Sequence, residues 1–103
     1  MPGSLFPTTR RSVVLALASD DAAERTRAFD ALAAIYWKPL YKYARVAHRH
    51  AAADAEDLTQ SFLAREFEKN ALAEYDAEKA SFRTFLRTLF DRYAANERKA
   101  VSR

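Results

Sequence analysis

The 103-residue chain has no cysteine, one glycine and three prolines. The lack of cysteine excludes a disulfide framework, a thiolate zinc site and a cysteine nucleophile, and it fits a reducing compartment. The scarcity of glycine and proline argues against sheets, because strands need turn residues at short intervals. No apolar run approaches the roughly 18 residues that cross a bilayer, and the N-terminus lacks the pattern of a signal peptide. We therefore expect a cytoplasmic protein without a membrane segment.

Hydrophobic residues make up 50% of the chain and aromatic residues 13%. This is enough for one domain with its own core. The charges fall in three blocks: residues 1–53 carry 8 basic and 4 acidic side chains, residues 54–78 carry 2 and 8, and residues 79–103 carry 7 and 2. Such blocks favour a domain that presents electrostatically different surfaces to two partners.

Apolar residues recur at helical spacing along most of the chain. We expect a flexible arm over residues 1–8, then an all-α domain over residues 9–100, a compact bundle of four to five helices. A short helix follows Ser12, and Asp20-Asp21 caps a second helix, because aspartate side chains accept hydrogen bonds from free N–H groups at a helix start. Pro39 interrupts the pattern, which predicts either one kinked helix or a new helix that continues to about His50.

Two further helices are expected in the second half of the chain. Asp54 is predicted to cap the first, whose apolar face contains Leu58, Phe62, Leu63 and Phe67. Residues 70–81 are predicted to form a loop with a turn of helix, and Ser81 to cap the last helix. That helix has the clearest apolar period in the chain, formed by Phe82, Phe85, Leu86, Leu89, Phe90, Tyr93 and Ala94.

Residue patterns for catalysis or for a cofactor are not found in the sequence. There is no paired-histidine metal motif, no glycine-rich phosphate loop and no nucleophile–base pair at a familiar spacing. His48 and His50 stand two apart, so they would not share a helix face, and exposed histidines at a helix end need no metal to explain them. We therefore expect neither an enzyme nor a bound cofactor or metal ion.

Three segments, in order, carry the functional signal. They are Tyr36-Trp37-Lys38-Pro39-Leu40-Tyr41-Lys42-Tyr43-Ala44-Arg45, then Asp54-Ala55-Glu56-Asp57-Leu58-Thr59-Gln60-Ser61-Phe62, then Ser81-Phe82-Arg83-Thr84-Phe85-Leu86 with the basic helix end Asn96-Glu97-Arg98-Lys99. Together they resemble region 2 of bacterial sigma factors of the extracytoplasmic-function (ECF) group, which typically show Asp-Ala-Glu-Asp-Leu-x-Gln-x-x-Phe and then Phe-Arg-x-Trp/Phe-Leu. The resemblance covers nearly the whole chain.

This resemblance implies a transcription initiation factor that docks on the β′ clamp helices of RNA polymerase through its acidic helix. The candidates for polymerase binding are Asp54, Asp57 and Gln60, whose spacing puts them on one polar side of a helix, together with Ser61. Spacing alone also fits an ordinary capped, solvated helix start. Ser61 stands where the family often has an acidic residue, which predicts a weaker polymerase contact.

The resemblance also implies that the last helix and the loop before it bind and open the promoter −10 element, on its non-template single strand. Arg83 and Arg87 fall on one side of that helix and would contact phosphates. Unstacked bases need aromatic surfaces, for which Tyr75 and exposed edges of Phe85 or Phe90 are candidates, although aromatic residues at helical spacing usually form the core. The predicted DNA-binding residues are Tyr75, Lys79, Arg83, Arg87, Arg92, Arg98 and Lys99.

The last helix departs from the family pattern at positions that bear on promoter preference. Phe85 stands where tryptophan is common, Arg92 where asparagine is frequent, and Asn96 where the family often has an aspartate. Region 4, the family's second helical domain, has no counterpart here, which fits either an excised domain or a short protein that works without it. The alternative hypothesis is a sigma-like adaptor that binds polymerase or an anti-sigma factor without recognising DNA.

Overall fold

The structure, a computed structural model, describes residues 11–69 and 71–102, except for the side chains of residues 71, 73 and 99–102. The predicted arm over residues 1–8 lies outside these ranges. The described part contains no strand, and the predicted all-α bundle is confirmed. None of its helices is long and apolar enough to span a bilayer. In chain order the elements are α1 (Arg11–Ala16), α2 (Ala22–Val46), α3 (Ala52–Lys69), the short 3₁₀ helix η1 (Ala71–Glu74) and α4 (Phe82–Ser102).

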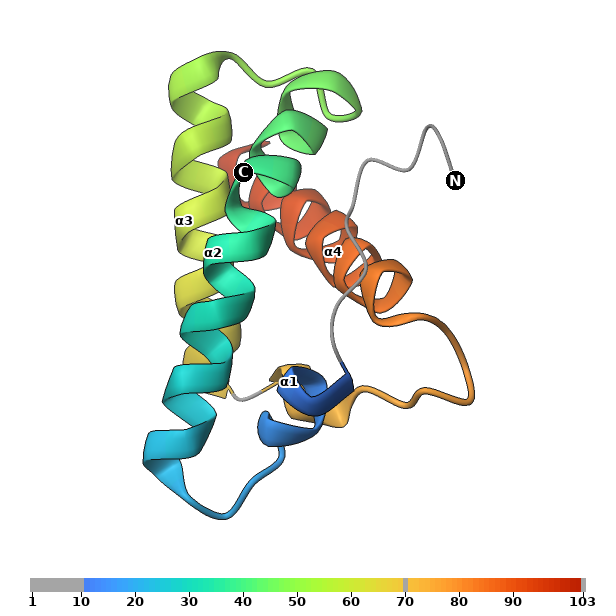
Figure 1. Ribbon diagram of the computed structural model, residues 1–103. Coiled ribbons are helices and arrows are strands. Elements are labelled where there is room, and N and C mark those ends of the chain that lie inside the picture. Colours follow the sequence, from blue (N-terminus) through green and yellow to red (C-terminus); the bar gives the residue numbers. More distant parts are fainter. Residues whose placement is uncertain (1–10, 70, 103) are drawn as a thin grey trace.

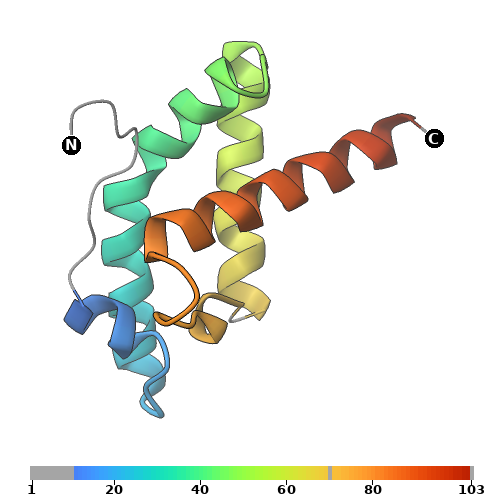
Figure 2. The same cartoon turned by 90° about the vertical axis from the view of Figure 1, so that its right-hand side faces the viewer.

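Helices α2 and α3 form an antiparallel pair that lies side by side (Figure 1). α4 crosses this pair, and its C-terminal part extends past α3 (Figure 2). α1 and η1 lie together at the end of the pair where α2 begins and α3 finishes (Figure 1). The crossing leaves two grooves between α3 and α4, one toward each end of α3.

Helix α2 begins where the sequence predicts. The Asp21 side chain accepts a hydrogen bond from the Ala23 N–H at 3.0 Å, which satisfies one of the free donors at the helix start. Of the two alternatives at Pro39, the structure has one continuous helix with the proline inside it. A proline in a helix interior costs about 3 kcal/mol. Burial of Tyr36 and Leu40 on either side of it, 1% and 0% exposed, offsets that cost.

The end of α2 differs from the prediction. The helix ends at Val46 rather than near His50. Three residues later, Arg49 has a φ angle of 57°, in the left-handed region that residues other than glycine rarely adopt. The chain therefore turns toward α3 earlier than the apolar pattern indicates.

The start of α3 also corrects a prediction. Asp54 is not the N-cap, because the helix begins at Ala52 and the N–H of Ala55 already bonds to the carbonyl of Ala51 at 2.9 Å. The high helix propensity of alanine extends the helix into the segment expected to be a joint. Asp54 lies in the first turn instead, where its charge still favours the helix dipole.

The core lies where α4 crosses the α2–α3 pair. Phe62 and Phe90, both 0% exposed, meet there with ring centroids 5.1 Å apart. Together with the burial of Phe82, this confirms the predicted apolar face of α4. Phe67, predicted on the apolar face of α3, is instead 45% exposed, although its ring still contacts that of Phe29.

The connection between α3 and α4 is mostly loop, as predicted, with η1 as its turn of helix. Ser81 caps α4 as predicted, since its Oγ accepts a hydrogen bond from the Thr84 N–H at 3.3 Å. The Tyr75 hydroxyl donates to the carbonyl of Ala80 at 2.6 Å, and its ring packs against Phe82 with centroids 5.2 Å apart. These contacts hold the loop against the start of α4.

Candidate interaction surfaces

A groove of about 890 Å³ lies between the first part of α3 and the C-terminal part of α4. Its lining includes all four residues predicted to bind polymerase, and all four are exposed. Buried Leu58 and Ala94 form an apolar base beneath them. We call this surface the acidic groove, because Asp54 and Asp57 on α3 and Glu97 on α4 border it. The spacing of Asp54, Asp57 and Gln60 predicts that they share one side of α3, and all three line this groove.

The α4 wall of the acidic groove contains residues that the sequence did not assign to it. Tyr93, predicted as core, is half-buried and lines the groove beside Glu97 and Arg98. Burial raises the pKa of Tyr93; among its neighbours, Ser61 lowers this pKa and Glu97 raises it. The sequence feature that could have indicated this position is a tyrosine near the end of the apolar face of α4. A tyrosine ring can pack against the core while its hydroxyl reaches polar groups at the surface.

A second groove, of about 780 Å³, lies among α1, η1 and the start of α4, and it contains some of the residues predicted to bind DNA. Tyr75 and Arg83 line it, and both are half-buried. Lys79 is exposed in the turn before α4. Of the two phenylalanines considered for base contacts, Phe85 is half-buried, whereas Phe90 is 0% exposed and cannot reach a base.

The remaining DNA candidates lie around different sides of α4. Arg87 is exposed one turn after Arg83. Arg92 lies about 180° around the helix from Arg83, since each residue advances about 100°. Arg98 lines the acidic groove, and the side chain of Lys99 lies outside the described residues. The predicted DNA-binding residues therefore do not form one continuous surface.

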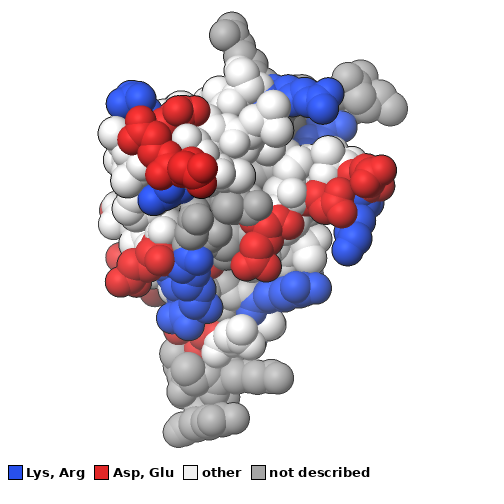
Figure 3. All heavy atoms as spheres, turned by 90° about the horizontal axis from the view of Figure 1, so that it is seen from below, with Lys and Arg blue, Asp and Glu red and all other residues white. Residues whose placement is uncertain are grey.

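The charges on the end of the molecule where α3 finishes are mixed in sign (Figure 3). Basic and acidic side chains alternate across this face, without a broad area of either sign. The three charge blocks of the sequence therefore do not produce a single-sign surface here, because successive helical residues point in different directions.

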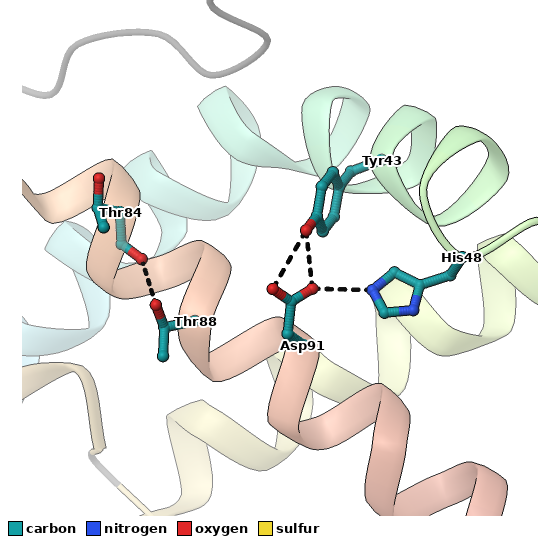
Figure 4. A network of polar contacts seen from close by, with 5 residues as sticks. All are labelled: Tyr43, His48, Thr84, Thr88 and Asp91. Carbon is teal, nitrogen blue, oxygen red and sulfur yellow. Dashed lines mark hydrogen bonds and ion pairs between the residues drawn. The ribbon is translucent and has the colours of Figure 1, made fainter.

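A polar network joins α2, the loop after it and α4 (Figure 4). The Tyr43 hydroxyl donates to the Asp91 carboxylate, with its oxygen 2.8 Å from Oδ1 and 3.1 Å from Oδ2. His48 Nε2 lies 2.9 Å from the same Oδ1. Burial raises the pKa of Tyr43, and Asp91 raises it further. Nearby, the Thr88 hydroxyl only bonds back to its own helix, at the carbonyl of Thr84.

The network corrects the prediction for the two histidines. His48 was expected to be exposed, but its side chain is 14% exposed and its ring packs edge-on against Phe90. Its ring also stacks on that of His50, with centroids 6.3 Å apart. Both residues follow the end of α2, so the spacing rule for a helix face does not apply to them.

Within the described part of the chain, no three His, Asp or Glu side chains are grouped so that they could hold a metal ion. Comparisons with protein-family models, with curated proteins and with solved structures gave no match.

Proposed function

We propose that the chain is a transcription initiation module that docks on the β′ clamp helices of RNA polymerase through the acidic groove and binds the −10 promoter strand through the first half of α4. The observation that carries this proposal is the convergence of Asp54, Asp57 and Gln60 on one wall of a single groove. These residues were selected by their motif, and the groove gives them a common apolar base.

An acidic border over an apolar base suits an amphipathic helix with basic side chains. Exposed Ala64 and the half-buried ring of Tyr93 supply the apolar contact. The exposed carboxylates of Asp54 and Asp57 are available to lysine or arginine side chains of the partner. Helix-in-groove recognition of this kind takes its affinity from the apolar face. The charges accelerate association and disfavour acidic partners.

The test is the affinity of the intact chain for a β′ clamp-helix fragment, measured by calorimetry. Asp57→Lys should weaken binding about tenfold or more, because it places a like charge against a basic partner. Glu56→Lys is the matched control, since Glu56 is exposed on the same turn of α3 but outside the groove. Unchanged affinity for Asp57→Lys, or equal losses in the two variants, would reject the docking site.

Strand binding is supported by Arg83 and Arg87, one turn apart near the start of α4. Replacing both with alanine should weaken binding to a single-stranded −10 oligonucleotide. The slope of log K against log salt concentration should become less negative by about 0.7 for each lost phosphate contact. The control replaces Arg27 and Lys38, which are exposed on α2 away from the grooves. Equal losses in both double variants would indicate non-specific attraction only.

The second candidate function is a sigma-like adaptor that binds polymerase or an anti-sigma factor without recognising DNA. It is favoured by the observation that two of the aromatic residues considered for base contacts already pack within the protein. Phe90 is fully buried, and Tyr75 uses both its ring and its hydroxyl to hold the loop. An adaptor should bind the clamp-helix fragment normally and lose no oligonucleotide affinity when Arg83 and Arg87 are replaced.

A further inference from the structure

A smaller groove of about 310 Å³ lies between the C-terminal half of α3 and the middle of α4. Three cationic side chains line it: Arg65 and Lys69 from α3, and Arg92 from α4. All three are exposed, and none forms an ion pair or hydrogen bond with another described residue. We call this surface the basic groove. Of the three, only Arg92 was singled out by the sequence.

Helix geometry explains why these cations meet. Arg65 and Lys69 are four residues apart and therefore share one side of α3. Arg92 lies on the side of α4 away from Arg83, and this side faces α3 at the groove. Like charges gathered from two helices repel one another. A bound anion would remove that repulsion.

Two carboxylates, Glu66 and Glu97, also line the basic groove and offset part of its positive charge. Glu66 is 7% exposed; burial raises its pKa, while Lys69 and Arg65 lower it. Glu97 lies close enough to the Tyr93 hydroxyl to raise the pKa of Tyr93, which burial already raises. Three cations against two carboxylates leave a net positive charge, and the exposed amide of Asn96 adds a neutral donor at the groove.

We propose that the basic groove binds one phosphate group of a nucleic-acid backbone through Arg65, Lys69 and Arg92. The inference rests on the proposed function, because it adds a phosphate contact for nucleic acid that also binds Arg83 and Arg87. Since Arg92 lies on the opposite side of α4 from Arg83, the strand would pass around α4 to reach both. The planar guanidinium fork matches two phosphate oxygens, and lysine adds a point charge. Exposed side chains hold a lone anion weakly, which suits one contact among several along a strand rather than a site for a free nucleotide.

The first test is binding of the intact chain to a fluorescein-labelled single-stranded oligonucleotide at several salt concentrations. Arg65→Gln with Lys69→Gln should weaken binding at least tenfold, because even one lost charge-assisted hydrogen bond has about that effect and this variant removes two donors. The matched control is Arg27→Gln with Lys38→Gln, which removes the same charge from exposed positions of α2. All substituted side chains are exposed, but Arg65 and Lys69 also favour the ionised form of buried Glu66. A thermal melt of each variant therefore checks that both are folded at the temperature of the binding measurement. Equal losses in the two variants would overturn the proposal.

A second measurement detects the anion directly. Adding inorganic phosphate at constant ionic strength should shift the side-chain Nε–H signals of Arg65 and Arg92 in ¹H–¹⁵N spectra, while that of Arg27 stays in place. Equal shifts at all three arginines, or none at the groove, would overturn the site.

These experiments also distinguish a failure of the basic-groove proposal from a failure of the proposed function. If the groove variant matches its control while the Arg83 and Arg87 variant loses affinity, the groove proposal alone fails. If the intact chain binds the clamp-helix fragment but no oligonucleotide, both the groove proposal and the DNA part of the proposed function fail, and polymerase docking stands.

Discussion

At the scale of single residues, Glu66 stands out as a charged side chain that is buried, within the part of the chain that the structure describes. It is a carboxylate in α3 with 7% of its surface exposed, in contact with grooves on both sides of the helix. Burial raises its pKa above the ordinary 4.5, although Lys69 and Arg65 partly oppose the shift. Between the unfolded and the folded pKa, the folded state holds a proton that the unfolded state has released. Stability therefore falls as the pH rises through that window.

Glu66→Gln should raise the melting temperature by a few degrees at pH 7, because it removes a buried charge and keeps the shape. The gain should vanish at a pH below the ordinary pKa of 4.5, where the wild-type carboxyl is already neutral. Glu68→Gln, at the exposed position two residues later, is the control and should change little. Thermal melts at pH 7 and pH 3.5 decide between these outcomes. A gain that is the same at both values would mean that ionisation of Glu66 does not matter.

Some residues could be placed from the sequence and others could not, depending on whether their contacts are local. Asp54, Asp57 and Gln60 could be grouped because their spacing along one helix fixes their direction. His48 could not be placed, since its half-buried position depends on Asp91, 43 residues away. Contacts between distant segments leave no local pattern, so the side chains that make them look like ordinary surface residues.

At the scale of secondary-structure elements, the Asp91 carboxylate links α4 to the end of α2. It accepts a hydrogen bond from Tyr43 and contacts His48, so two segments that precede α3 are tied to the helix that follows it. Asp91→Ala should lower the free energy of unfolding by about 2 kcal/mol, the sum of two net hydrogen bonds of about 1 kcal/mol each. Urea denaturation measures this change.

Thr88→Ala serves as the control one turn earlier on α4, because its hydroxyl bonds only within its own helix. A double-mutant cycle of Asp91→Ala with Tyr43→Phe should give a coupling energy of about 1 kcal/mol. If the two losses simply add, the hydrogen bond between Tyr43 and Asp91 does not contribute to stability.

The elements themselves were predictable to different degrees. α4 was predicted well, because its apolar residues have a clean helical period and Ser81 caps it. The continuity of α2 through Pro39 was left open, since local propensity favours a break. Packing of Tyr36 and Leu40 into the core decides the matter. That packing comes from helices later in the chain, which no local rule contains.

At the scale of the whole molecule, the acidic groove and the basic groove both depend on how α4 crosses α3. The acidic groove has one wall on α3 and the other on α4, and the basic groove is built in the same way. The sequence therefore predicted that Asp54, Asp57 and Gln60 share one side of α3, but not that Tyr93 and Glu97 of α4 lie opposite them. The crossing is held by Phe62, whose ring meets those of Phe90 at 5.1 Å and Tyr93 at 5.6 Å.

Phe62→Ala should therefore affect both surfaces at once, whereas Asp57→Lys should affect only one. Removing a buried phenylalanine costs about 3–5 kcal/mol, a large part of the roughly 5–15 kcal/mol that stabilises a typical domain. Binding to the clamp-helix fragment and to the oligonucleotide should fall in parallel with the folded fraction, followed together across a urea series. Phe67→Ala, at a 45% exposed position on the same helix, should leave both activities near wild type. Oligonucleotide binding that survives Phe62→Ala while clamp binding is lost would show that α4 binds DNA without its packing on α3.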